Sequence, residues 1–130
     1  MAAAPSFIST PRLTQVNVSS ANTAIDGSGS ITSLMTGAAA GTRVLEVDVQ
    51  CAATSAAALV NLFISLDGGS TWKLFDQITV SAATSSNTVK ANRNLTTYAN
   101  LILPNASAVL GITTTIAQST NVIALGGDLT

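Results

Sequence analysis

The chain has 130 residues, a length that fits one domain able to bury a core without disulfides or metals. Only 8% of the residues are charged, the net charge is -1, and 47% are hydrophobic, so we expect a polar but almost uncharged surface. The basic residues form no cluster that could neutralise a phosphate backbone, and no run approaches the ~18 apolar residues of a membrane-spanning helix, so neither nucleic acid nor membrane is expected as a partner.

The chain begins with a segment that we expect to be an extended arm. Residues 1–11 contain two prolines, which resist regular strand pairing, and residues 12–130 form the expected β-sandwich domain. Phe7 and Ile8 are apolar residues in this otherwise unanchored segment. The arm is therefore a candidate for binding a partner, and the alternative is a disordered tail. The segment has no basic start and no long apolar centre, so we do not expect it to be a secretory signal.

Beyond the arm, short runs of β-branched and aliphatic residues are broken by Gly, Asn, Ser and Ala at intervals of about ten residues. In the clearest run, alternation places Leu45, Val47 and Val49 on a buried face, and Glu46 and Asp48 on a solvent-facing one. About eight or nine strands are predicted. They cover residues 13–18, 31–35, 44–49, 60–66, 72–80, 88–91, 98–103, 109–115 and 121–125.

Two alanine-rich stretches favour a helix by propensity alone, at 38–40 and 52–59. Both are short, are flanked by Gly, Ser or Thr, and lack the charged residues that cover the wet side of a helix. We interpret 52–57 as a loop with at most a single helical turn. Without helical connections the sheets must be largely antiparallel, and the expected fold is all-β, a sandwich or barrel.

The residues that could carry chemistry are few. The chain has no histidine, which removes the commonest general base and the usual Ser-His-Asp arrangement. Glu46 and Asp48 could form a pair of catalytic carboxylates, but on the predicted strand they have no evident cleft. The lone Cys51 is expected to be a small core residue, with a reactive thiol as the alternative. We therefore expect no enzyme, and no cofactor, metal or catalytic residue.

One motif stands out between two predicted strands. Ser65, Asp67, Gly69, Thr71 and Trp72 fit the Asp-box pattern S-x-D-x-G-x-T-W at every specified position. The motif resembles the structural turns of sialidases and other propellers, which lie far from the catalytic site. A single copy without a repeating frame does not predict a glycosidase. We expect a structural hairpin turn, and the alternative is sugar recognition through an exposed Trp72.

Four segments in order resemble a family of small tailed-phage virion proteins. They are 42–45 (TRVL), the Gly-rich hairpin at 61–80, 101–104 (LILP) and 121–128 (NVIALGGD), and the resemblance covers roughly residues 42–129. It implies an antiparallel β-sandwich of jelly-roll type with about eight strands. It also implies a capsid decoration or cement protein on the outer head surface of the phage particle, assembled in the bacterial cytoplasm.

The implied partner is the major capsid protein or another virion protein. The alternative function is a host-surface or glycan-binding module of a phage tail or head spike. Few charged residues protect the predicted strand edges, so we expect a homo-oligomer, a trimer first and a dimer second. The low charge also predicts an attachment that tolerates high salt.

Overall fold

Eight strands and their loops make up the computed structural model, which describes residues 8–52 and 54–129. Within those ranges there is no helix, and so none that could cross a bilayer. The strands are β1 (Ile8–Val18), β2 (Thr32–Thr36), β3 (Thr42–Cys51), β4 (Ala58–Ser65), β5 (Lys73–Val80), β6 (Arg93–Leu103), β7 (Val109–Thr114) and β8 (Thr120–Leu129).

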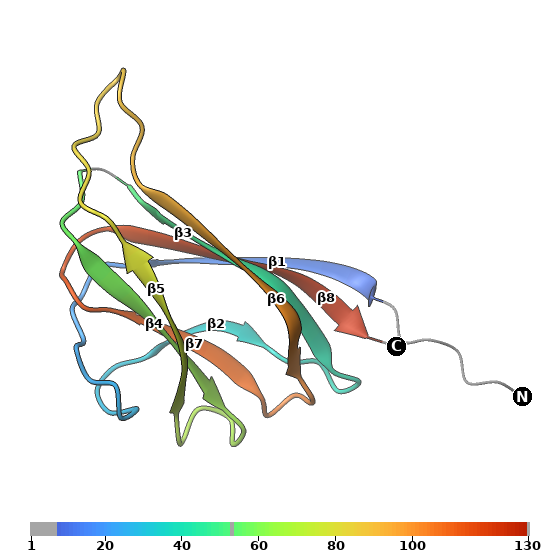
Figure 1. Ribbon diagram of the computed structural model, residues 1–130. Helices are drawn as coiled ribbons and strands as arrows, with labels where there is room; N and C mark the ends of the chain where they lie inside the picture. The colour runs from blue at the N-terminus through green and yellow to red at the C-terminus, as the bar shows by residue number, and fades with distance from the viewer. Residues whose placement is uncertain (1–7, 53, 130) are drawn as a thin grey trace, which may run out of the picture.

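The strands form two four-stranded sheets that lie one over the other (Figure 1). Sheet A has the order β1-β8-β3-β6 and sheet B the order β2-β7-β4-β5, with every neighbouring pair antiparallel. The chain changes sheet at every connection except the β4–β5 hairpin. The predicted all-β, antiparallel, sandwich-like fold is therefore confirmed.

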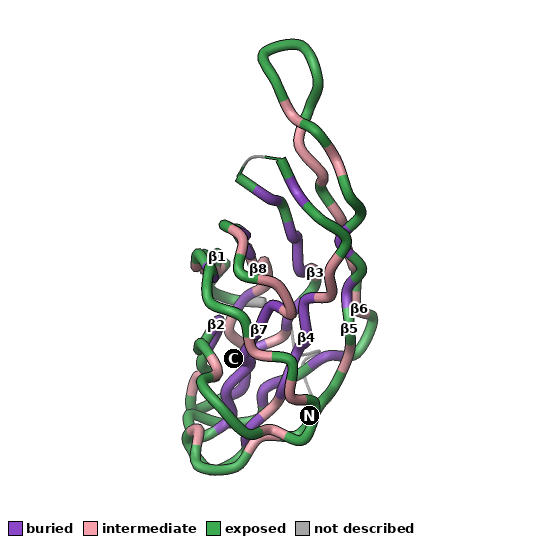
Figure 2. The backbone as a smooth tube through the Cα atoms, turned by 90° about the vertical axis from the view of Figure 1, so that its left-hand side faces the viewer, coloured by how far each residue is buried: buried purple, intermediate pink, exposed green. Residues whose placement is uncertain are grey.

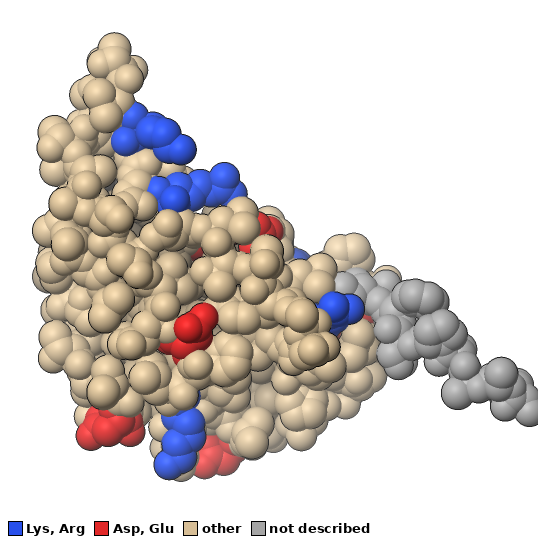
Figure 3. All heavy atoms as spheres, in the orientation of Figure 1, with Lys and Arg blue, Asp and Glu red and all other residues tan. Residues whose placement is uncertain are grey.

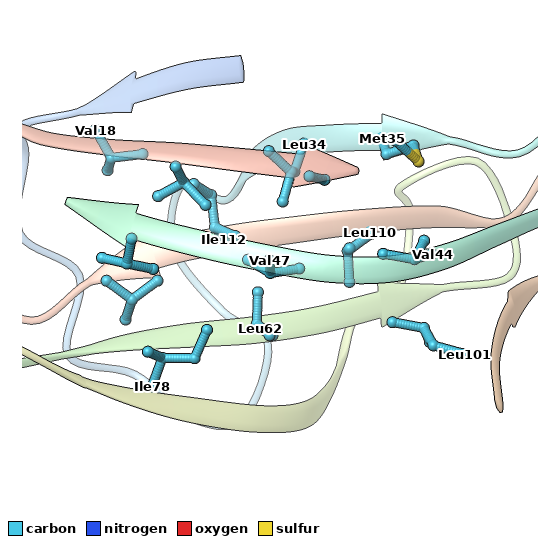
Figure 4. Close-up of a cluster of buried hydrophobic side chains, with 14 of the residues drawn as sticks. Val18, Leu34, Met35, Val44, Val47, Leu62, Ile78, Leu101, Leu110 and Ile112 are labelled. Atoms are coloured by element: carbon cyan, nitrogen blue, oxygen red, sulfur yellow. The ribbon is translucent and has the colours of Figure 1, made fainter. Parts of the chain in front are cut away.

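The core fills the space between the two sheets (Figure 4). Sheet A contributes mainly valines and sheet B mainly leucines and isoleucines. Cys51 is buried in this core as a small apolar residue. Each fully buried Val, Leu or Ile side chain stabilises the fold by about 1.5–3 kcal/mol, which is why the sandwich needs no covalent cross-link. The largest buried core side chains are Met35, Leu62, Leu103, Leu110, Ile112, Val44, Val47, Val49, Val60, Val80 and Val122.

A β-bulge in β3 changes which residues face the core. Val44 pairs with Gly126 of β8 and Glu46 pairs with the preceding residue, Leu125, so Leu45 is an extra residue in β3. An extra residue lets two successive side chains, here those of Leu45 and Glu46, point to the same face. Val44 is therefore fully buried, while Leu45 is 38% exposed on the outer face. The predicted buried position of Leu45 is wrong, because simple alternation cannot anticipate a bulge.

The strand predicted at 88–91 is also wrong. These residues lie in the long loop 81–92, which rises beyond the sandwich between β5 and β6 and is largely exposed (Figures 1 and 2). The Ser86 hydroxyl accepts hydrogen bonds from the backbone N–H groups of Thr88 and Val89. Local bonds of this kind hold the backbone in a turn and compete with strand pairing.

The expected N-terminal arm overlaps β1. Ile8 begins the strand, and Pro11 pairs with Gly127 of β8, so residues 8–11 belong to sheet A. Proline is tolerated there because β1 is an edge strand. Residues 1–7, Phe7 among them, lie outside the described residues.

Side chains link the two sheets at both sides of the sandwich. On one side, the Tyr98 hydroxyl of β6 donates a 2.8 Å hydrogen bond to Asp76 of β5, and the Tyr98 ring lies 5.5 Å from that of Phe75. On the other side, Arg12 of β1 donates a 2.6 Å hydrogen bond to the Thr36 carbonyl of β2. These links hold the edges of facing sheets together, where no backbone ladder connects them.

Tyr98 gives a direct test of the link between β5 and β6, because it is the only tyrosine in the chain. Burial raises its pKa, and the hydrogen bond and negative charge of Asp76 raise it further. We predict that tyrosinate absorbance does not appear near pH 10 while the sandwich is folded. The pKa of Tyr98 is higher in the folded protein than in the unfolded chain. The stabilisation that the neutral Tyr98 hydroxyl gives to the fold is therefore complete below about pH 10 and is lost as the pH rises above it.

The control is Asp76→Asn, which removes the charge but keeps the burial. It should move the titration midpoint of Tyr98 part of the way back towards 10. A midpoint near 10 in the folded wild-type protein would show that this link is not formed.

Candidate functional site

The Asp-box residues come together in the turn between β4 and β5. The Ser65 hydroxyl accepts a 2.8 Å hydrogen bond from the Gly69 N–H and donates a 2.7 Å hydrogen bond to the Asp67 carboxylate. The Thr71 N–H donates to the same carboxylate oxygen at 2.9 Å. Gly69 has a φ of 98°, a conformation that favours glycine. The motif therefore builds a closed, internally hydrogen-bonded turn.

These hydrogen bonds stabilise the ionised form of Asp67. The bond from the Ser65 hydroxyl, followed by that from the Thr71 backbone, lowers the pKa of Asp67 to about 2. Because the folded-state pKa is depressed, the stabilisation is present above the ordinary value of 3.8 and is lost as the pH falls towards 2. Asp67 is thus an electrostatic anchor of the turn.

Trp72, the last Asp-box residue, is half-buried on the outer face of sheet B. A Cβ atom added to Gly111 of β7 would lie 2.6 Å from the six-membered ring of Trp72 and 2.7 Å from the Ile31 side chain. The glycine therefore makes room for the indole. Phe63, the ladder partner of Gly111, is fully buried on this face. Trp72 thus takes part in a packed cluster that covers this part of sheet B.

The outer face of sheet A carries a second group of functional candidates. Ladder partners point to the same side of a sheet, so the outward residues form rows across its four strands. One row is Asn17, Asn121, Gln50 and Arg93, and the next is Gln15, Ile123, Asp48 and Leu95. The two rows surround a hollow of about 570 Å³, the Asp48 hollow, lined by Gln15, Val16, Asn17, Asp48, Gln50, Arg93, Asn121 and Ile123.

Asp48 is the buried charged group of this hollow. Its carboxylate Oδ2 accepts a 2.8 Å hydrogen bond from Arg93, and the two side chains form an ion pair. Asp48 is only 7% exposed, so its predicted exposure to solvent is wrong. It does project from the outer face, but Leu95 and Ile123 flank it on the neighbouring strands and shield it from water.

Glu46 lies next to Asp48 on the same face of β3. Partial burial raises the pKa of Glu46, and the negative charge of Asp48 raises it further. The two carboxylates are therefore close enough to interact, although Glu46 does not line the hollow. In the described part of the chain, no cluster of His, Cys, Asp and Glu suits a metal ion.

The outer face of sheet A also carries exposed apolar residues, interspersed with Arg43 and Glu46. Leu13, Leu45, Leu95 and Ile102 are between 38% and 59% exposed, and we call them the apolar patch. Charged side chains form only small, separate groups on a largely uncharged surface (Figure 3). The alternating pattern indicated these strands, but it did not indicate that apolar residues would gather on their outer side.

Comparison of the chain with protein-family models and with curated proteins gives no match. The function is therefore inferred from the sequence and from the geometry of the two sheet faces.

The Asp-box turn can be tested with Ser65→Ala. We predict that the pKa of Asp67 rises from about 2 towards 3.8, because its largest stabilising hydrogen bond is removed. The Gly69 N–H also loses its acceptor, and the free energy of unfolding should fall by about 1 kcal/mol. Carbon NMR of the Asp67 carboxyl across a pH series and urea denaturation measure the two effects.

Ser70→Ala is the matched control, because Ser70 is exposed in the same turn. It should leave both quantities unchanged. If Ser65→Ala and Ser70→Ala gave the same pKa of Asp67 and the same free energy of unfolding, the hydrogen bonds of Ser65 would not stabilise the turn.

Proposed function

We propose that this chain is a non-enzymatic structural protein of a phage particle. In this proposal it decorates the capsid on the outer head surface, where it binds and stabilises the lattice of the major capsid protein. The observation that carries the proposal is the apolar patch on an open sheet face of a chain with very few charges. Exposed apolar side chains gathered on one face are typical of a protein-binding surface.

The strand order supports the finer assignment of the fold as a jelly roll. Eight antiparallel strands alternate between two four-stranded sheets, with β1 beside β8 in one sheet and β2 beside β7 in the other. A jelly roll is a double-sheet arrangement of eight strands built from two Greek keys, and it recurs in viral capsid proteins. The topology therefore agrees with the resemblance to phage virion proteins.

The two outer sheet faces support the choice of docking surface. On sheet B, Trp72 and Ile31 lie against Gly111, and Phe63 beside it is buried. On sheet A, the apolar patch has no such cover among the described residues. Burial of that patch against a shell protein would stabilise the complex by removing apolar surface from water. Such a contact needs few ion pairs and is only weakly screened by salt.

This attachment can be tested on purified particles. We predict that occupancy stays constant from low to molar salt, because apolar burial dominates the contact. Leu13→Glu should lower occupancy at least tenfold, since its ladder partner is Leu125 and the new charge would be buried unpaired in the interface, with a cost of ~1.4 kcal/mol for each factor of ten. Stained gels of washed particles measure both effects.

Leu66→Glu is the control for an added surface charge. Leu66 is 67% exposed in the Asp-box hairpin, away from sheet A, and its replacement should leave occupancy unchanged. Steep loss of the protein in molar salt, or full occupancy with Leu13→Glu, would contradict docking through the apolar patch.

We also propose that the protein self-associates, as a trimer first and a dimer second. The edge strand β2 (TSLMT) has no charged residue that would block pairing with another chain. Light scattering from the purified protein should give three times, or else twice, the 13.0 kDa mass of one chain. A single-chain mass at tens of micromolar would contradict this prediction.

A further inference from the structure

The Asp48 hollow contains a carboxylate oxygen whose hydrogen bonding is incomplete. Oδ2 of Asp48 is paired with Arg93, but Oδ1 has no hydrogen-bond partner within the described ranges. The Asp48 side chain is only 9% exposed, so water reaches it poorly. Glu46, beside it, cannot supply a donor while it is ionised. Buried polar atoms are normally satisfied, and Oδ1 exposes less than 1 Å², so a ligand donor in the hollow would complete it once a neighbouring side chain moves aside.

The wall of the hollow offers further hydrogen-bonding groups of both kinds. Asn17 donates from its amide to Asn121 at 2.8 Å and to Ser119 at 2.9 Å, which leaves the Asn17 carbonyl oxygen and the Asn121 amide N–H groups for a ligand. The side chains of Gln15 and Gln50 also line the hollow, and each carries a donor and an acceptor. The hollow therefore presents donors and acceptors in similar number.

Charge and composition narrow the class of ligand. The Asp48 charge is already matched by Arg93, and Glu46 lies nearby, so an anion such as phosphate would be repelled and a cation would compete with the guanidinium. The hollow also lacks the carboxylates and histidines of a metal site in the described part of the chain. The remaining fit is a neutral ligand whose groups both donate and accept hydrogen bonds.

Hydroxyl groups meet this requirement, since each one donates to one partner and accepts from another. Ile123 lines the same hollow and offers an apolar surface to C–H groups. The volume, about 570 Å³, lies within the range of small-molecule binding sites. A sugar ring combines several hydroxyls with an apolar face, and it matches the hollow in both respects.

We propose that the Asp48 hollow binds a neutral saccharide, with the surrounding amides contacting its hydroxyls and one of these hydroxyls donating to the Asp48 carboxylate. This binding activity does not involve the Asp-box tryptophan. It shares the outer face of sheet A with the apolar patch, since Leu95 of the patch pairs with Asp48, so sugar binding and docking through the patch would compete. Sugar binding concerns only the end of sheet A formed by the last residues of β1 and β3 and the first residues of β6 and β8.

The test is an array of oligosaccharides probed with the purified chain. The array carries neutral hexose and N-acetylhexosamine chains together with sialylated and sulfated ones, and calorimetry then measures affinity for the best neutral sugar. We expect binding to neutral sugars. Gln15→Ala and Gln50→Ala should each weaken it about three- to tenfold, and Asp48→Asn at least tenfold.

Two variants keep the test independent of folding. Gln15→Ala leaves the Asp48–Arg93 pair intact, and its melting temperature should match the wild type. Asn87→Ala removes an exposed amide from the loop 81–92, outside the hollow, and should leave sugar affinity unchanged.

Three results would overturn the proposal. They are binding confined to acidic sugars, no binding to any sugar on the array, and neutral-sugar binding that survives both Asp48→Asn and Gln15→Ala. If these two variants reduced occupancy on particles while no sugar bound, the hollow would instead receive a side chain of a protein partner.

Discussion

The packing of two sheets through their inner faces is the constraint on which the rest of this structure depends. Each strand must present apolar side chains to the same narrow space, and that space is filled by aliphatic residues without an aromatic ring among the fully buried ones of the core cluster. Once the inner faces are committed, every other residue of a strand projects outward. The outer faces and the open strand edges are then the places where this chain can interact with other molecules.

The two outer faces differ in how far they are covered, and this difference shows how a chain with few charges can recognise other molecules. Near β7, sheet B is covered by Trp72 from the Asp-box turn and by Ile31 from the β1–β2 loop. Sheet A keeps an open face with exposed apolar residues along it and a group of amide side chains at one end. Recognition by such a face depends on shape and hydrogen bonding rather than on long-range electrostatic attraction.

Most strands could be predicted from the sequence, because β-branched runs and turn residues report local preference directly. The Asp-box turn could also be predicted, since the hydrogen bonds of its Ser65 and Asp67 side chains lie within a few residues along the chain. The outward position of Leu45 could not be predicted, because a bulge depends on the register of β8, which is distant in sequence. The burial of Asp48 could not be predicted for the same reason, since its shielding neighbours, Leu95 and Ile123, come from two other strands.

The contact between Trp72 and Gly111 restricts how this chain can change during evolution. A side chain at position 111 would enter the space occupied by the indole, so the glycine is not replaceable while the tryptophan remains. Loss of the tryptophan would release position 111 but would uncover the buried Phe63 beside it. The two residues are far apart in the sequence and should therefore be inherited as a pair, and a descendant that lost one would come under selection to replace the other.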